Sequence, residues 1–95
     1  MNIRQLHTQE KPVSAISIFK SELGNATAIK ILKDETLKEH ITKIPALLIC
    51  VEGEAIFENE KGFKETLKTG DYVNIEPMVK HWVKAKIESQ LILIK

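Results

Sequence analysis

The segment GDYVNIEPMVKH, residues 70–81, decides how this chain folds. It opens with the turn pair Gly-Asp, after which Val73 and Ile75 share one face of a short strand. Pro77 then ends the strand, because proline has no N–H to donate to a sheet. The segment closes on His81, where the next strand begins. A strand, a proline turn and a second strand in so few residues predict an antiparallel β structure.

The strand that begins at His81 shows the clearest alternation in the sequence. Successive strand residues point to opposite faces, so one face of this strand is apolar and the other is largely charged. We therefore expect His81 to point toward the interior and Trp82 to point outward. The predicted inner face consists of His81, Val83, Ala85 and Ile87, and the outer face of Trp82, Lys84, Lys86 and Glu88.

The same pattern extends outward to the rest of the chain. Short alternating or wholly apolar runs are separated by turn residues such as Gly24, Gly53 and Gly62. This is typical of one all-β domain, an antiparallel β-barrel or jelly roll spanning residues 1–95. In one of these runs, Phe63 and Leu67 are expected to share one face. The other predicted strands lie at residues 15–19, 26–33, 46–51, 55–57, 63–67, 72–75 and 91–94.

Residues 28–39 leave a helix open as an alternative. Ala28, Ile31 and Leu32 have helical spacing, and good helix formers follow them. The apolar stripe does not continue, however, because glutamates occupy its next positions and no convincing cap follows. A strand is therefore the favoured prediction here.

Two runs, residues 46–51 and 91–94, are apolar at every position, so both of their faces need cover. In a chain this short a second subunit is the expected cover, which predicts a homodimer. Aromatic residues are enriched in interface cores, so the outward tryptophan is a further candidate for the contact. The candidate contact residues are Leu47, Ile49, Val51 and Trp82.

Charge and composition exclude several classes of function. Lys and Arg number 14 against 13 Asp and Glu, and the two signs are interleaved, so no basic patch for nucleic acid or anionic lipid is predicted. No apolar run approaches membrane-spanning length or resembles a signal peptide. The single cysteine, Cys50, precludes an internal disulfide, and a cytoplasmic location is expected.

Residues 37–81 resemble the cupin family of small β-barrels, whose two motifs face each other inside a jelly roll. The first family motif is His-x-His, three or four residues, Glu, six residues and Gly. Here His40 and Gly53 match that motif, whereas Thr42 stands at the second histidine position and Ala46 at the glutamate position.

The second family motif is a glycine, a strand, a proline turn and a histidine. Residues 70–81 follow this plan closely, with Gly70 at its start and His81 at its end. Met78 replaces the glycine that often occupies the turn. The resemblance therefore implies a minimal single-domain cupin.

The same resemblance implies a metal site and a ligand pocket inside the barrel. Metal-binding members hold a divalent transition ion, such as zinc, iron, manganese, nickel or copper, with about three histidines and one glutamate. Only His40 and His81 match those positions, and two imidazoles leave most of the coordination to other donors. The implied pocket is lined by His40, Thr42, Ala46, Leu48 and His81.

Other residues offer little to complete a metal centre. Cys50 lies on the same strand face as Ala46, but four residues of strand span about 13 Å, too far to replace a ligand at position 46. A buried thiol that packs as a small apolar residue is the favoured interpretation. Thr42 could hold a bound water or a ligand hydroxyl, although threonine is also a common strand residue. Both histidines could equally be neutral, hydrogen-bonded core residues.

These observations suggest three functions. The favoured one is a small-molecule-binding or accessory domain with a largely apolar pocket and a weak or absent metal. The second is a metalloenzyme of isomerase or oxygenase type, in which water or substrate completes a reduced two-histidine site. The third is a structural module that acts through dimerisation. No phosphate-binding loop, nucleophile elbow or Cys-x-x-Cys pair suggests a fourth.

Overall fold

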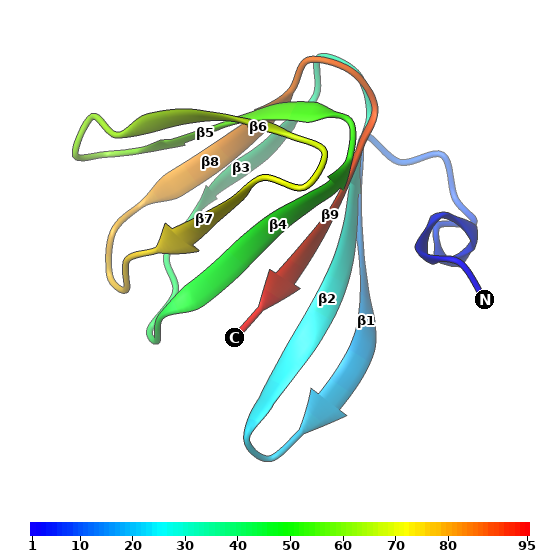
Figure 1. The fold of residues 1–95 in the computed structure, drawn as a ribbon, viewed down its shortest axis with the longest axis horizontal. Coiled ribbons are helices and arrows are strands. Elements are labelled where there is room, and N and C mark those ends of the chain that lie inside the picture. Colours follow the sequence, from blue (N-terminus) through cyan, green and yellow to red (C-terminus); the bar gives the residue numbers. More distant parts are fainter.

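The computed structural model describes residues 1–95 as two antiparallel sheets that face each other, with one short 3-10 helix near the N-terminus (Figure 1). No helix in it is long and apolar enough to cross a membrane. The helix is η1 (Ile3–Leu6), and the strands are β1 (Val13–Ser21), β2 (Gly24–Ile31), β3 (Thr36–His40), β4 (Ala46–Glu52), β5 (Glu54–Asn59), β6 (Lys64–Lys68), β7 (Tyr72–Ile75), β8 (His81–Ala85) and β9 (Ser89–Ile94).

One sheet has five strands in the order β1-β2-β9-β4-β7, and the other has four in the order β3-β8-β5-β6. The chain passes from one sheet to the other several times, which is the connectivity of a jelly roll. The predicted all-β antiparallel fold is confirmed. The two sheets stay separate, however, and do not close into one continuously hydrogen-bonded barrel.

The segment that left a helix open is strand. Its first part belongs to β2, which pairs with β1 and β9, and its last part forms β3, which pairs with β8. In β2, Ile29 and Ile31 face the core while Lys30 between them faces outward. Asp34 adopts a left-handed φ of 66° after β2, where the chain turns into the second sheet. The favoured strand prediction is confirmed.

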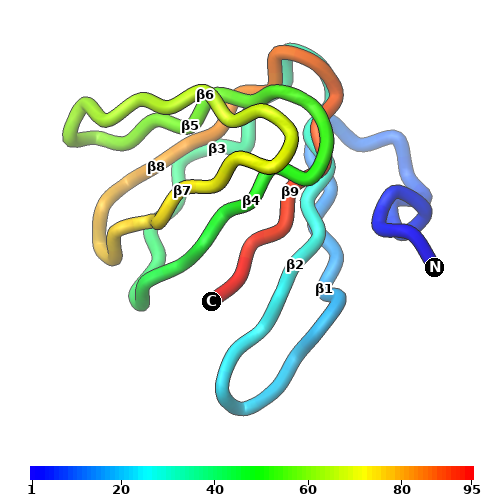
Figure 2. The backbone as a smooth tube through the Cα atoms, viewed as in Figure 1, coloured from blue at the N-terminus to red at the C-terminus, as the bar shows by residue number.

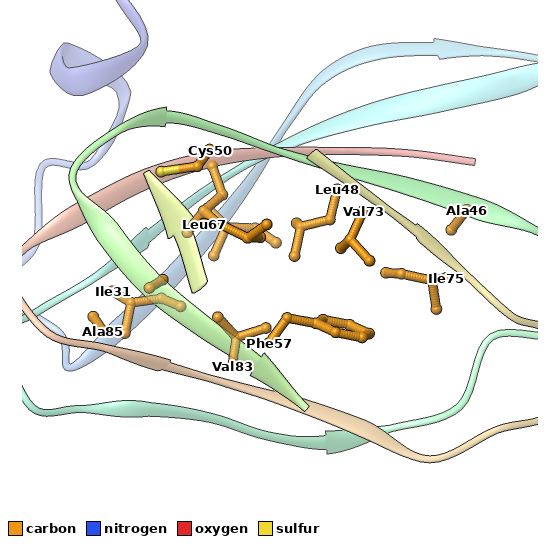
Figure 3. Packing of buried hydrophobic residues seen from close by; sticks show 13 residues of the cluster. Ile31, Ala46, Leu48, Cys50, Phe57, Leu67, Val73, Ile75, Val83 and Ala85 are labelled. Atoms are coloured by element: carbon orange, nitrogen blue, oxygen red, sulfur yellow. The ribbon is translucent and has the colours of Figure 1, made fainter. Parts of the chain in front are cut away.

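The core is a layer of buried apolar side chains between the two sheets (Figure 3). Leu48 from the five-stranded sheet and Phe57 from the four-stranded sheet both lie in this layer, and each is only 2% exposed. In β8, His81, Val83 and Ala85 are buried, as the alternation predicted. Cross-strand neighbours on these inner faces therefore supply most of the apolar burial that stabilises the fold.

Ile87, predicted to face the interior with the apolar residues of β8, is 50% exposed instead. The reason is that β8 ends at Ala85, so strand alternation no longer applies at residue 87. The prediction for Ile87 was therefore wrong. Phe63 lies just before β6 and is 46% exposed, but its ring packs edge-on against the buried Phe57, with centroids 6.1 Å apart.

Two connections between the sheets meet at one corner of the molecule. Gly53 joins β4 to β5, and the β8–β9 connection passes beside it. The hydroxyl of Ser89, which is fully buried, accepts a hydrogen bond from the Glu54 N–H over 3.1 Å and donates one to the Ile87 carbonyl oxygen over 2.8 Å. We call this contact the Ser89 corner.

The N-terminal segment covers part of the outer face of the five-stranded sheet. Helix η1 contacts β2, and His7 is buried with its Nδ1 atom 2.8 Å from the Ser14 hydroxyl oxygen. Ser14 pairs with Lys30, and Lys30 pairs with Gln90, so the three form a buried polar row across β1, β2 and β9. Beyond this row the β1–β2 hairpin extends past the rest of the molecule (Figure 2).

Gly53→Ala is expected to destabilise the fold by about 3 kcal/mol or more. Gly53 has a φ of 113°, and an added Cβ would lie 2.5 Å from the Ser89 hydroxyl oxygen and 2.8 Å from the Glu88 carbonyl oxygen. Gly62→Ala is the matched control: its φ is 88°, but nothing lies within 4 Å of the added Cβ. That variant should lose only about 1 to 2 kcal/mol. Urea unfolding of both variants measures the difference, and equal losses would contradict the steric argument.

Candidate functional site

A cavity of about 180 Å³ lies between the two sheets. Residues from both sheets line it, and eight of its thirteen lining residues are apolar. The apolar share of the wall includes Leu48 from β4, Ile75 from β7 and Val83 from β8. The cavity therefore favours an apolar occupant and leaves only a few polar groups to orient it.

His40 and His81 both line this cavity. They are directly opposite each other in the β3–β8 pairing, and their ring centroids are 6.2 Å apart. Their environments differ, because His40 is exposed and His81 is 5% exposed. The ring of His81 also stacks on Phe57, with centroids 5.6 Å apart and planes inclined by 22°. The structure thus places one histidine at the surface and the other in the core layer.

His81 is held in its neutral form. Burial lowers the pKa of its imidazole and is the largest effect; the hydrogen bond to the Val79 carbonyl raises the pKa by less, and the nearby His40 and Lys95 side chains lower it by smaller amounts still. The Nδ1 atom lies 3.5 Å from that carbonyl oxygen, a long hydrogen bond. Donation from Nδ1 leaves the Nε2 lone pair free to accept a hydrogen bond from a ligand.

Thr42 contributes an unpaired hydroxyl to the same cavity. It is 5% exposed and lines the cavity, and its Oγ1 atom is buried without a hydrogen-bond partner. A buried hydroxyl without a partner costs about 1–3 kcal/mol relative to a paired one. Thr42 therefore has hydrogen-bonding capacity that no other group of the chain uses.

Four of the five predicted pocket residues line the cavity, and the fifth does not. The four on the cavity wall are His40, Thr42, Leu48 and His81. The fifth, Ala46, is buried in the core at 6% exposure and does not line the cavity.

Several other lining residues were not predicted from any sequence motif. Ala15 and Thr27 reach the cavity from β1 and β2, and Lys95 reaches it from beyond the end of β9. Only the pairing of β2 with β9 brings the β1–β2 hairpin to this site. Alternation could identify these residues as inward facing, but no local pattern could show that they line this cavity.

A strained turn holds the two sides of the site together. Met78, which stands where family members often have glycine, adopts a left-handed φ of 65°. Its backbone N–H donates a 2.8 Å hydrogen bond to the Thr42 carbonyl oxygen. The turn between β7 and β8 is thereby tied to the segment between β3 and β4, which carries Thr42.

The donor set does not suit a four-ligand metal centre. His40 and His81 are accompanied in the cavity by the Thr42 hydroxyl, and the structure contains no group of three or more His, Cys, Asp or Glu side chains placed to bind one ion. A protein zinc site is usually completed by four such donors, or by three and a water. The residues present therefore do not fit the metal site that the family resemblance implied.

Two other residues singled out from the sequence lie away from the cavity. Cys50 is fully buried in the core, at the opposite end of β4 from Ala46 (Figure 3), and burial raises the pKa of its thiol. Trp82 is half-buried on the outer face of the four-stranded sheet, where its indole N–H donates a 2.8 Å hydrogen bond to Glu58. Neither residue contributes to the site.

Comparison with solved structures identifies the fold. A cupin superfamily protein from Desulfitobacterium hafniense has a TM-score of 0.85 and 16% identity, with 98% of this chain and 84% of that chain covered. An RmlC-like cupin from Desulfovibrio desulfuricans has a TM-score of 0.81 and 15% identity, with 90% of this chain and 83% of that chain covered. A cupin-2 domain protein from Shewanella frigidimarina has a TM-score of 0.80 and 18% identity, with 100% of this chain and 92% of that chain covered. No family model and no curated protein matches the sequence.

The unfolding free energy is expected to fall as the pH drops below about 6.5, the ordinary pKa of histidine. The unfolded chain protonates His81 and His7 in this range, whereas the folded protein resists protonation because both pKa values are lowered. Stability is therefore full above pH 6.5 and declines toward the lowered folded-state values. Urea titrations between pH 5 and 8 measure this slope. It should be shallower in His81→Phe, and an unchanged slope would contradict the assignment to His81.

Met78→Gly is expected to stabilise the protein by roughly 0.5 to 1 kcal/mol. Glycine removes the left-handed strain at φ 65°, and little packing is lost because Met78 is 64% exposed. Asp34→Gly is a matched control at φ 66°, and its gain should be smaller because aspartate tolerates this conformation better. A thermal shift of each variant tests the ranking, which a destabilised Met78→Gly protein would refute.

Proposed function

We propose that this chain, which has the cupin fold, binds a small and largely apolar molecule in the cavity between its sheets without a resident metal. The observation that carries the proposal is the buried, unpartnered Thr42 hydroxyl in a mostly apolar cavity wall. Such a hydroxyl gains a full hydrogen bond when a ligand supplies the missing partner. A cytoplasmic location stays a prediction of the sequence.

The size of the cavity limits the ligand. At about 180 Å³ it is slightly larger than an engineered cavity of about 150 Å³ that binds benzene. A single six-membered ring with one or two small substituents fills such a space. Larger substrates could enter only if the exposed side of the cavity, near His40 and Lys95, left part of them in solvent.

The polar groups of the wall define the ligand's chemistry. The Thr42 hydroxyl can donate or accept, the neutral His81 can accept at Nε2, and the exposed Lys95 is charged at the rim. A ligand hydroxyl satisfies Thr42 and His81 together, and a carboxyl group pairs with the lysine. We therefore propose a compact ring or branched aliphatic compound with one hydroxyl or carboxyl group.

Thr42→Val is expected to weaken phenol binding roughly threefold to tenfold, because the isosteric valine lacks the hydroxyl that pairs with phenol. Toluene, a probe of the same size without a hydroxyl, should bind the variant as well as it binds the wild type. Thr42→Ser should retain most of the phenol affinity. Chemical-shift titrations of the backbone amides around the cavity measure both probes. The proposal fails if neither probe shifts these amides.

Thr42→Val should also keep or raise the free energy of unfolding, because the wild-type hydroxyl has no hydrogen bond to lose. Urea unfolding of the variant and the wild type measures this difference, and a clear loss of stability would contradict it.

Metal analysis of protein purified without an affinity tag tests the alternative that the protein is a metalloenzyme. A stoichiometric transition metal that disappears in His81→Ala would overturn the metal-free proposal and support the reduced two-histidine metalloenzyme.

A further inference from the structure

The first twelve residues are held to the rest of the molecule at very few points. His7 is the one buried side chain among them, at 8% exposed, and all the others except the half-buried Ile3 are exposed. Two spaces remain between this segment and the five-stranded sheet, one of about 520 Å³ against β1 and one of about 140 Å³ against β4 and β9. Figure 1 shows the segment to one side of the two sheets. His7 is therefore its anchor.

The other contacts of the segment are weak or lie at its end. Arg4 lies 3.5 Å from Glu52 in an ion pair whose side chains are 59% and 54% exposed, and pairs this exposed contribute little to stability. The Pro12 carbonyl oxygen accepts a 2.9 Å hydrogen bond from the Leu32 N–H, next to the start of β1. Docking of the segment therefore depends on the surroundings of His7.

His7 lies over a row of polar residues on the outer face of the sheet. Its Nδ1 atom is 2.8 Å from the Ser14 hydroxyl oxygen. Strand register continues this row from Ser14 to Lys30, Gln90 and Glu52. Lys30 is only 6% exposed, and no ion pair of the chain includes it. The segment therefore covers an ammonium group that has no carboxylate partner.

These surroundings suit a neutral imidazole better than a charged one. The Nε2 atom of His7 is buried without a hydrogen-bond partner. Protonation of the ring leaves the Ser14 contact possible, but it buries an unpaired N–H at Nε2 and places a positive charge near Lys30. Burial accordingly lowers the pKa of His7, and the Lys30 ammonium lowers it further. A protonated His7 is more stable in water than on the sheet.

No carboxylate of the neighbouring strands offsets this effect. Glu52 is the only one in the polar row, but it lies two strands from Lys30, about 10 Å away, and it pairs with Arg4. Strand β9 carries no charged residue. The other charged groups on the segment, on β1 and just after β2 are all exposed, namely Glu10, Lys11, Lys20, Lys33 and Asp34.

We propose that residues 1–12 form a detachable cover, which is docked on the five-stranded sheet while His7 is neutral and is released when His7 is protonated. Docking hides the polar row, and release exposes the Lys30 ammonium with the Ser14 and Gln90 side chains beside it. At mildly acidic pH the sheet thereby gains a basic, hydrogen-bonding surface that it lacks at neutral pH. This device acts on the outer face and is independent of the ligand proposed for the cavity.

Hydrogen exchange of the full chain, measured by NMR between pH 7 and 5, tests this proposal. The Leu32 amide reports release because its acceptor belongs to Pro12. Its opening constant should rise by up to about tenfold per pH unit below about 6.5, the ordinary pKa of histidine. Heteronuclear NOE values of residues 3–7 should fall in parallel. The amides of β4, which is paired on both sides, report global unfolding, and their opening constants should stay far below that of Leu32.

Three variants separate the roles of the residues. His7→Gln keeps a neutral side chain that can still pair with Ser14, so its Leu32 opening constant should not change with pH. Lys30→Met removes the buried ammonium, and its opening constant should rise less between pH 7 and 5 because a docked His7 then resists protonation less. Lys33→Met is the matched control: it removes an exposed lysine just after β2 and should behave like the wild type.

A wild-type opening constant that stays the same between pH 7 and 5 would overturn the proposal, as would an unchanged pH dependence in His7→Gln. A rise at Leu32 while residues 3–7 remain ordered would also overturn it, because the segment would then still be docked. Equal rises in Lys30→Met and Lys33→Met would refute the role assigned to Lys30. Circular dichroism of each variant establishes that it is folded.

Discussion

The arrangement of the two sheets depends on hydrogen bonds at the corner where the chain crosses between them. Ser89 ties the β4–β5 and β8–β9 connections together with one buried hydroxyl. Near it the Ala85 carbonyl oxygen accepts from the Asp34 N–H and the Ala85 N–H donates to Glu35, so the β2–β3 connection is tied to the same region. Backbone groups that leave one sheet are therefore paired before they enter the next, which a buried crossover requires.

The cavity lies toward the opposite end of the sandwich. There the two connections near the site are linked by the Met78 to Thr42 backbone hydrogen bond, and Met78 carries a strained backbone. A left-handed residue is also found at the first corner, where Asp34 has a φ of 66°. Such backbone conformations persist only where surrounding hydrogen bonds and packing stabilise them.

Alternation in the sequence predicted the antiparallel strands, and the resemblance of residues 37–81 to cupins predicted the jelly roll. The motif around His81 was informative because its alternation and its proline turn act locally. Ile87 was misplaced because strand ends depend on neighbouring strands. The contributions of Ala15, Thr27 and Lys95 to the cavity were not predictable, since they follow from the pairing of β2 with β9 across more than half of the chain. The unpaired Thr42 hydroxyl likewise needed coordinates.

The two sides of the β1–β2 hairpin have different surroundings, because one side lines the cavity and the other is the outer face of the sheet. Ala15 and Ile29 line the cavity, while their chain neighbours Ile16 and Ala28 point to the opposite side of the sheet. A substitution on the outer side that shifts the β1–β2 pairing would therefore also shift the cavity wall, because both sides belong to the same strands. The shape of the cavity is in this way sensitive to residues that never touch its contents.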